Sequence, residues 1–173
     1  MTSDTGDIVW TGDFTQDLKD QITRYSNLLI GAEGFAHSVT RRLKMKETAV
    51  FRRDKDEKTH CKVTLELTVD EDMVNLNGTM HGGCAVALID VCSSMALTAL
   101  AMYTGKPFNF VSQALNTTFH APAPLGVKIE MVNTTVSFGA RTVSAVTEIW
   151  DVTNGRLCMT GVHNKMAPSQ PKL

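Results

Sequence analysis

The chain has 173 residues, 43% of them apolar, which suits one domain with a substantial buried core. Its 17 basic and 18 acidic residues give a net charge of −1, which argues against the basic surface that nucleic-acid binding usually requires. The 4 cysteines form no C-x-x-C pair, so we expect buried free thiols in a reducing compartment rather than disulfides or a metal site.

The N-terminal segment is interpreted as a flexible tail over residues 1–12, followed by a helix within residues 13–35. Asp13 and Gln16 have the spacing of a capping box, and Gly31 is suited to end the helix. Apolar residues recur at steps of three and four, which predicts one buried face made of Phe14, Leu18, Ile22, Tyr25 and Leu28.

The first 30 residues lack the basic start of a secretory signal, so an intracellular soluble protein is the default, located in the cytoplasm. The last three residues, Pro171-Lys172-Leu173, resemble the peroxisomal address S-K-L but differ at its first position. A peroxisomal or mitochondrial location therefore stays open.

The segment from Ala36 to Arg53 interleaves apolar and charged residues, which we interpret as two short strands. A clearer strand follows over residues 61–70, because apolar and polar residues alternate there. Its core face is predicted to consist of Cys61, Val63, Leu65, Leu67 and Val69.

A long apolar helix is predicted from Cys84 to Tyr103, a stretch without glycine or proline. Residues 83–103 are also about long enough to cross a bilayer. Asp90 in the middle of this segment would cost roughly 2.5 to 3.5 kcal/mol in a membrane. A central helix wrapped by a sheet is therefore the better interpretation, and no membrane insertion is expected.

Four strands are expected after the helix, over residues 110–119, 127–136, 141–151 and 156–166. Asn154-Gly155 is typical of a two-residue hairpin between the last two. The order of elements predicts an α+β fold in which an antiparallel sheet of roughly five or six strands packs on the helix. This domain would span residues 36–166, with a C-terminal tail over residues 167–173.

The start of this helix and the carboxylate within it carry the candidate chemistry. Gly82 and Gly83 allow another group to approach closely, and the first amides of a helix have no partner inside it, so they can stabilise an oxyanion. A buried carboxylate needs a partner. Asp90 could therefore be catalytic, or it could be held structurally by Ser93 and Ser94 one turn later.

His81 and Asp90 lie nine residues apart, about two and a half helical turns, so they project to opposite sides of the helix. His81 could serve only as a cap of the helix. If both residues belong to one site, two antiparallel copies around a two-fold axis can supply them more easily than one chain can. We therefore expect a site at a homodimer interface.

The loop and the helix together carry the pattern Asn75-x-x-Gly78-Thr79-x-His81-Gly82-Gly83 followed by Asp90. This pattern resembles the hotdog-fold thioesterases of the PaaI type, and the likeness runs from about residue 61 to residue 166. It implies a long central helix wrapped by a curved antiparallel sheet, with the predicted N-terminal helix as an addition. It also implies homodimers that often pair into tetramers, and hydrolysis of acyl-CoA thioesters in lipid metabolism.

The resemblance further implies roles for single residues. Asp90 is the general base or the nucleophile, and the Gly82 amide polarises the thioester carbonyl. Asn75 and Ser112 hold the attacking water. His81 orients the thioester or assists the leaving thiolate.

Coenzyme A (CoA) is part of the substrate in this interpretation, so neither a cofactor nor a metal is expected. CoA phosphates usually bind Lys or Arg side chains. The candidate CoA contacts are Gly83, Lys165 and Arg141. Lys165 and Arg141 could also be plain surface charges.

Two other functions remain compatible with these residues. A hydratase or dehydratase acting on acyl thioesters can share the fold, although the pattern around Asn75 fits hydrolysis better. A non-catalytic module that binds acyl-CoA or an acyl-carrier protein would keep the two glycines at the helix start without needing Asp90.

Overall fold

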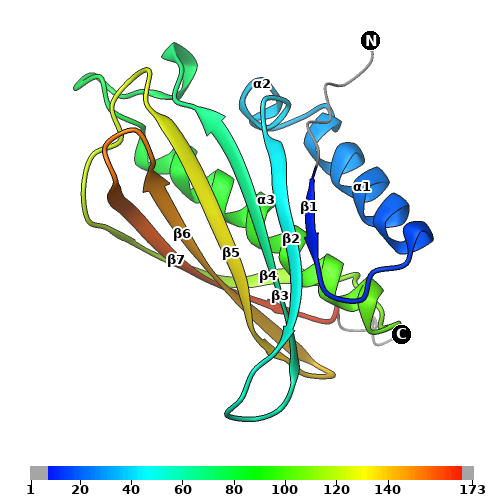
Figure 1. The fold of residues 1–173 in the computed structure, drawn as a ribbon. Helices are drawn as coiled ribbons and strands as arrows, with labels where there is room; N and C mark the ends of the chain where they lie inside the picture. Colours follow the sequence, from blue (N-terminus) through cyan, green and yellow to red (C-terminus); the bar gives the residue numbers. More distant parts are fainter. Residues whose placement is uncertain (1–7, 169–173) are drawn as a thin grey trace, which may run out of the picture.

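A computed structural model gives the structure of residues 8–168. A seven-stranded sheet curves around one long helix, α3 (Gly82–Tyr103), as Figure 1 shows. The strands lie in the order β1-β2-β3-β5-β6-β7-β4, and all neighbours are antiparallel except β1 and β2. The predicted wrapped helix is confirmed. The sheet has more strands than expected and is mixed, because the short β1 adds a parallel edge.

The strands are β1 (Val9–Thr11), β2 (Lys44–Arg52), β3 (Thr59–Thr68), β4 (Val111–Phe119), β5 (Lys128–Phe138), β6 (Thr142–Asp151) and β7 (Arg156–Met166). The core face predicted for residues 61–69 is confirmed, since its four apolar residues on β3 and Val69 directly after it are each at most 4% exposed. Alternating burial of this kind is what a sheet with one face on a core requires. The hairpin between β6 and β7 is longer than predicted, because Asp151 accepts hydrogen bonds from Asn154 and so shapes a wider turn.

Helix α3 is the core helix of the domain. Twelve of its 22 residues are buried, and they include most of its C-terminal half. It is long and apolar enough to cross a membrane, but 67% of its most apolar window is buried inside the protein. The apolar side chains of this helix are therefore mostly buried against the sheet and the rest of the core.

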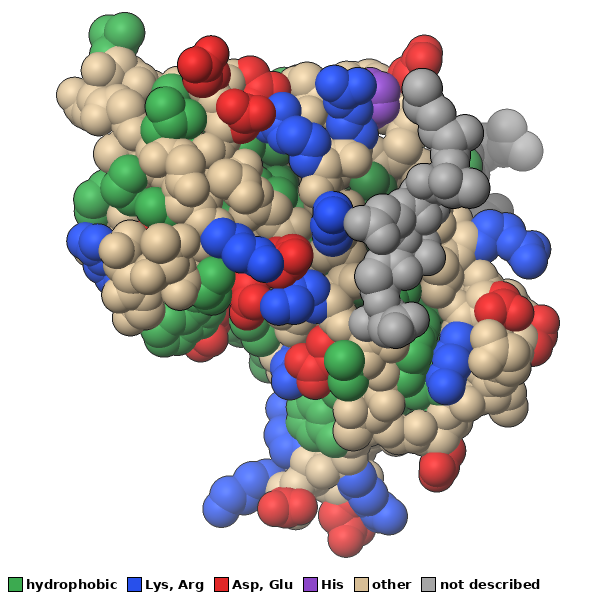
Figure 2. Space-filling view, turned by 45° about the horizontal axis from the view of Figure 1, so that its top comes forward, with side chains coloured by type: hydrophobic (Ala, Val, Ile, Leu, Met, Phe, Trp, Pro, Cys, Tyr) green, Lys and Arg blue, Asp and Glu red, His purple; other side chains and the backbone are tan. Residues whose placement is uncertain are grey.

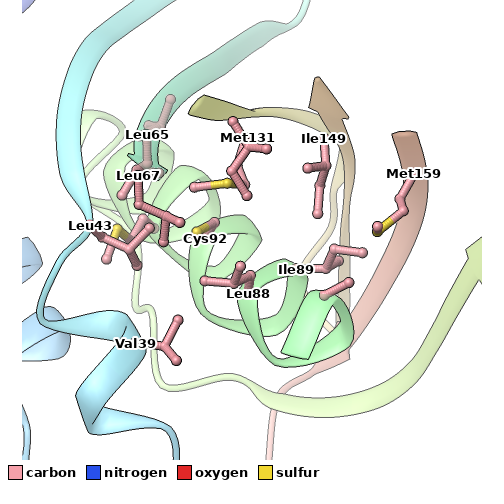
Figure 3. Close-up of a cluster of buried hydrophobic side chains, with 14 of the residues drawn as sticks. Val39, Leu43, Leu65, Leu67, Leu88, Ile89, Cys92, Met131, Ile149 and Met159 are labelled. Carbon is pink, nitrogen blue, oxygen red and sulfur yellow. The ribbon is translucent and has the colours of Figure 1, made fainter. Parts of the chain in front are cut away.

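The core lies between α3 and the inner face of the sheet. Figure 3 shows α3 residues Leu88, Ile89 and Cys92 beside side chains from the strands, and the labelled strand residues are Leu65, Leu67, Met131, Ile149 and Met159. Burying a side chain of this size stabilises the fold by about 1.5 to 3 kcal/mol. Gly161 lets β7 approach α3, because a Cβ at this position would lie 2.8 Å from the Cγ2 of Ile89.

The 4 cysteines are free thiols, as predicted. Cys61, Cys92 and Cys158 are buried, and Cys84 is half-buried. Burial raises the pKa of Cys61 to about 12 and also raises the pKa of Cys92. These thiols are therefore inert packing groups at neutral pH.

The N-terminal helix is confirmed as α1 (Gln16–Gly31), but its cap and its buried face differ from the prediction. Thr15, not Asp13, is the N-cap, and its Oγ1 accepts the Leu18 amide at 3.3 Å. Of the predicted face, Ile22 is buried and Phe14 and Leu18 pack against the core, whereas Leu28 is 70% exposed. Ser26 and Ile30 are buried in its place. Sequence periodicity could not choose between adjacent faces, and the contact of α1 with α3 decided it.

Two further expectations for the N-terminal part are wrong. Residues 9–11 form β1 rather than part of a tail, and the two short strands within 36–53 are instead one helical turn, α2 (His37–Thr40), and the single strand β2. The chain turns into α2 at Ala36, which has a left-handed φ of 61°. Residues 1–7 and 169–173 lie outside the described residues, so most of both predicted tails does too.

Strand β4 forms one edge of the sheet and lies close to α3 (Figure 1). Seven of its nine residues are exposed, and both of its ends carry large apolar side chains, with Val111 49% and Phe119 56% exposed. On the face shown in Figure 2, Lys and Arg side chains lie beside Asp and Glu side chains, in line with the net charge of −1. Strand β4 itself carries no Asp, Glu, Lys or Arg, so this exposed edge is distinguished by its backbone and apolar groups.

Candidate active site

The loop before α3 is held by its own hydrogen bonds. It follows the short helix η1 (Glu71–Met73), and the Asn75 amide donates to the Thr79 carbonyl at 2.9 Å. The Asn75 Oδ1 accepts from the Asn77 amide at 2.9 Å and from the Thr79 hydroxyl at 3.3 Å. Gly78 completes the turn with a φ of +70°, a conformation that glycine adopts without strain. Asn75 thus orders the loop that leads into the helix.

Helix α3 begins at Gly82, and His81 is its N-cap. The Nδ1 of His81 accepts the Gly83 amide at 2.9 Å, which requires this nitrogen to carry no proton. As the first residue of the helix, Gly82 has no acceptor within the helix for its own amide. The helix dipole adds partial positive charge at this end. The capping role considered for His81 is confirmed, and the Gly82 amide is a donor that a ligand can use.

A groove of about 430 Å³ opens beside this helix start. Asn75 and Gly82 line one wall, and Phe119 and His120 line the other at the end of β4. A Cβ on Gly82 would lie 3.2 Å from the Cζ of Phe119, so glycine permits the close approach of the two walls. We call Asn75, His81 and Gly82 the helix-start half-site.

Asp90 lies at a second centre, where α3 faces β4 and β7. Its Oδ1 accepts the Ser112 hydroxyl at 3.1 Å and lies 3.3 Å from the Nε2 of His163. The same Nε2 lies 2.9 Å from the Ser112 Oγ. The Asp90 side chain is 49% exposed, whereas His163 is fully buried. We call Asp90, Ser112 and His163 the acid half-site, since its carboxylate can meet water on its open side.

The two half-sites are separate within one chain. Gly82 and Asp90 lie eight residues apart on α3, which is about 12 Å along the helix axis. Asp90 contacts Ser112 and His163, and these three residues are not among those that line the groove beside Gly82. The structure therefore brings Ser112 to Asp90 as expected, but places Asn75, His81 and Gly82 at a different point.

Comparison with known proteins identifies the family. Residues 77–158 match the model of the thioesterase superfamily. Mouse acyl-coenzyme A thioesterase 13 is 33% identical over 104 residues, which are 60% of this chain and 71% of the mouse protein. The chain belongs to the thioesterase superfamily. The resemblance found in the sequence, and with it the prediction of a thioesterase enzyme, is confirmed.

Solved structures agree on the fold of this thioesterase. Zebrafish thioesterase superfamily member 2 has a TM-score of 0.66 at 24% identity, covering 90% of this chain and 100% of its own. A mutant of the phenylacetic acid degradation protein PaaI from Thermus thermophilus has a TM-score of 0.54 at 21% identity, covering 62% and 85%. A hypothetical thioesterase from Streptococcus pneumoniae, solved with coenzyme A, has a TM-score of 0.56 at 18% identity, covering 64% and 81%. The hotdog fold is thereby confirmed.

Ser93 and Ser94 on α3 do not bind the carboxylate of Asp90 in this thioesterase, although the sequence allowed them to hold it structurally. The Ser94 Oγ donates to the main-chain carbonyl of Asp90 at 2.7 Å, not to its carboxylate. The Ser93 Oγ donates to the Ile89 carbonyl at 2.6 Å and lies 2.7 Å from the Nδ1 of His163. The carboxylate of Asp90 is therefore bound by Ser112 and His163, from β4 and β7.

Sequence reasoning missed His163 as a member of the site. In β7 it has the same parity as Gly161 and Lys165, so strand alternation places all three on the face toward α3. Gly161 and His163 are indeed buried. A histidine at an inward strand position, with a glycine two residues earlier, was the signal that could have found it.

The candidate CoA contacts differ in their surroundings. Lys165 is half-buried, and its Nζ donates to the Ser94 Oγ at 2.8 Å. Burial lowers the pKa of Lys165, and the charge of Asp90 opposes this. Arg141 is exposed in the turn between β5 and β6. Lys165 therefore lies beside the acid half-site and is not a plain surface charge, while contact of either residue or of Gly83 with CoA stays a prediction.

Proposed function

We propose that this thioesterase hydrolyses acyl-CoA thioesters at a site shared by two copies of the chain. The separation of the two half-sites along α3 carries this proposal. The helix-start half-site offers the Gly82 amide as an oxyanion donor but no carboxylate, and the acid half-site offers the Asp90 carboxylate but no free amide of a helix start. Two antiparallel copies of α3 can place each half-site beside the complementary half-site of the other copy.

The chemistry follows from the groups present. The thioester carbonyl oxygen accepts the Gly82 amide of one copy, where the helix dipole favours the developing negative charge. Asp90 of the other copy, helped by Ser112, orients a water and takes its proton as the water oxygen attacks the carbonyl carbon. Collapse of the tetrahedral intermediate breaks the C–S bond and releases the acid and CoA. Asn75 keeps the loop in register for this geometry.

Two surfaces beside the half-sites suit the pairing of copies. Strand β4 is an exposed edge, and an unpaired edge strand is a template for another strand. On α3, Val86 is 36% exposed and lies one turn before Asp90. Pairing of β4 with its copy would cover Val111 and Phe119 as well. Further pairing of dimers into tetramers rests on the family resemblance.

The substrate class is supported by the relatives. The mouse relative is named for acyl-coenzyme A, and the streptococcal structure was solved with coenzyme A. Neither determines the acyl group of the present protein. Release of free thiol from a panel of short, long and aromatic acyl-CoAs will define it, and enoyl absorbance with crotonyl-CoA will report any hydratase activity.

The decisive variant is Asp90→Asn, which keeps the shape of the side chain and removes the base. We expect kcat on the best acyl-CoA to fall by about two to three orders of magnitude. Asp20→Asn is the matched control, because Asp20 is exposed on α1 and contacts Gln16. Near wild-type turnover by Asp90→Asn would refute the mechanism, and tight acyl-CoA binding without thiol release by the wild type would indicate a binding module.

A further inference from the structure

His163 is a buried titratable group that the proposed hydrolysis does not yet use. It is fully buried, and yet both of its ring nitrogens contact polar groups of the site. The Nδ1 lies 2.7 Å from the Ser93 Oγ, and the Nε2 lies 2.9 Å from the Ser112 Oγ and 3.3 Å from the Asp90 Oδ1. A ring held in this way has a defined orientation, so its protonation can be deduced from its neighbours.

Ser93 determines which nitrogen of His163 carries the proton. The Ser93 hydroxyl has one hydrogen and three acceptors within reach, which are the Ile89 carbonyl at 2.6 Å, the His163 Nδ1 at 2.7 Å and the Asp90 carbonyl at 3.3 Å. We assign the hydrogen to the Ile89 carbonyl, the shortest contact, and the Ser93 Oγ then accepts from the Nδ1–H of His163. In the neutral ring the Nε2 then carries a lone pair, and this lone pair faces Ser112 and Asp90.

This arrangement leaves a place for one more proton. Two acceptors, the His163 Nε2 and the Asp90 Oδ1, lie 3.3 Å apart, and Ser112 has a single hydrogen to offer them. A proton on Nε2 would satisfy both contacts at once, since Nε2–H could donate to Asp90 while Ser112 also donates to the carboxylate. The site is therefore built to accept a proton during the reaction.

We propose that His163, locked by Ser93 with its proton on Nδ1, stores the proton that Asp90 takes from the attacking water. This inference rests on the proposed thioester hydrolysis. As the water oxygen bonds to the carbonyl carbon, one water proton passes through Asp90 to Nε2. When the C–S bond breaks, that proton goes to the CoA sulfur, and the new carboxylic acid loses its remaining proton to solvent. Because His163 is fully buried, it receives and returns this proton through Asp90 and does not itself contact the substrate.

The charged groups around His163 favour a neutral ring before the reaction, with no proton on Nε2. Within residues 8–168, Asp90 on α3 and Lys165 on β7 are the charged groups that act on the pKa of His163. The residues paired with His163 on the neighbouring strands are uncharged, namely Leu115 on β4 and Ala145 on β6. Burial lowers the pKa of His163, Lys165 lowers it further, and Asp90 raises it. A neutral ring at neutral pH, with a carboxylate ready to pair with the charged form, follows from these effects.

The test is the pH dependence of kcat/KM for the wild type and for His163→Gln in the full chain. We expect kcat to fall by about 10- to 100-fold with KM nearly unchanged. The fall in activity at acid pH should move to lower pH in His163→Gln, because imidazole takes up a proton from solution at higher pH than a carboxylate does. Ser93→Ala, which removes the lock and keeps the ring, should give a smaller loss of kcat.

His60→Gln is the matched control, because His60 is also buried and also bonds to a neighbouring strand, at Thr135, outside the site. An unchanged pH profile in His163→Gln would overturn the proposal, whatever happens to kcat. Asp90→Asn separates the two ideas: if it is inactive while the His163→Gln profile is unchanged, only the proton store fails. Should His163→Gln not fold, 15N spectra of the wild-type histidines read the tautomer directly, and an Nε2–H ring at neutral pH would refute the lock.

Discussion

Replacement of Gly82 by proline removes the amide hydrogen and adds the pyrrolidine ring, so it probes the oxyanion donor when it is compared with a variant that adds a Cβ and keeps the amide. Gly82 is the first residue of α3, a position where proline is tolerated because the amide has no partner inside the helix. The preceding His81 has φ −63° and ψ 135°, within the extended region that a residue before proline adopts. Proline should therefore fit the backbone at this position.

Gly82→Ala is the matched control, since it adds the same Cβ and keeps the amide. This Cβ would lie 3.2 Å from the Cζ of Phe119, whose side chain is 56% exposed and can move aside. The loss of one oxyanion donor commonly lowers kcat by about 10² to 10³, or about 2.7 to 4 kcal/mol. We expect a loss of this size for Gly82→Pro and a change of only a few-fold for Gly82→Ala.

The assay is steady-state thiol release from the best acyl-CoA, with thermal unfolding measured for both variants. If both variants lose activity equally, the contact with Phe119 matters and the amide has no special role. If both keep wild-type kcat, the helix start is not the oxyanion site and the mechanism is refuted. Only a large difference between proline and alanine supports the proposed donor.

Three further predictions test the shared site, the packing and the buried histidine. A 1:1 mixture of Asp90→Asn and Gly82→Pro chains, unfolded and refolded together, should recover about a quarter of wild-type activity. Half of the dimers are then mixed, and each mixed dimer has one intact site out of two. If the mixture is no more active than the separate variants, the site is not shared between chains. Gly161→Ala should lower the free energy of unfolding by about 1 to 3 kcal/mol in urea titrations, because its Cβ would press on Ile89. Gly31→Ala is the control and should be neutral or slightly stabilising, because the space around Gly31 is open. Folding lowers the pKa of His163, so the contribution of its neutral ring to stability is fully present above about pH 6.5 and is lost as the pH falls through the folded pKa. The difference in unfolding free energy between wild type and His163→Gln should therefore be smaller at pH 5 than at pH 7.5. An equal difference at the two pH values would contradict the lowered pKa.

The elements predicted well are those in which local pattern and burial agree. The alternation from Cys61 to Val69 required a strand with one apolar face, and the uniform apolar run after Gly83 required a helix buried on most sides. The loop pattern from Asn75 to Gly83 depends only on turn and cap chemistry, which acts between neighbouring residues. Such features need no knowledge of the rest of the chain.

The elements predicted poorly depend on what packs against them. The buried face of α1 was assigned to the wrong side at Leu28, because several apolar residues share the helix and only contact with α3 selects among them. Strand β1 was missed because 3 residues carry too little pattern, and it exists through pairing with β2. The sequence left open whether Ser93 and Ser94 bind the Asp90 carboxylate, since each had more than one possible acceptor within reach.

By itself the sequence determined the central helix, its capped start, the carboxylate two turns later and membership of a thioesterase family, because each of these follows from residues close together in the chain. Only the tertiary structure decided that His163, 73 residues after Asp90, completes the acid half-site. Pairing between distant strands sets which side chains share a face, and no local pattern contains that information. The lone carboxylate of the sequence is thus one of three groups, with Ser112 and His163, that lie within 3.3 Å of one another.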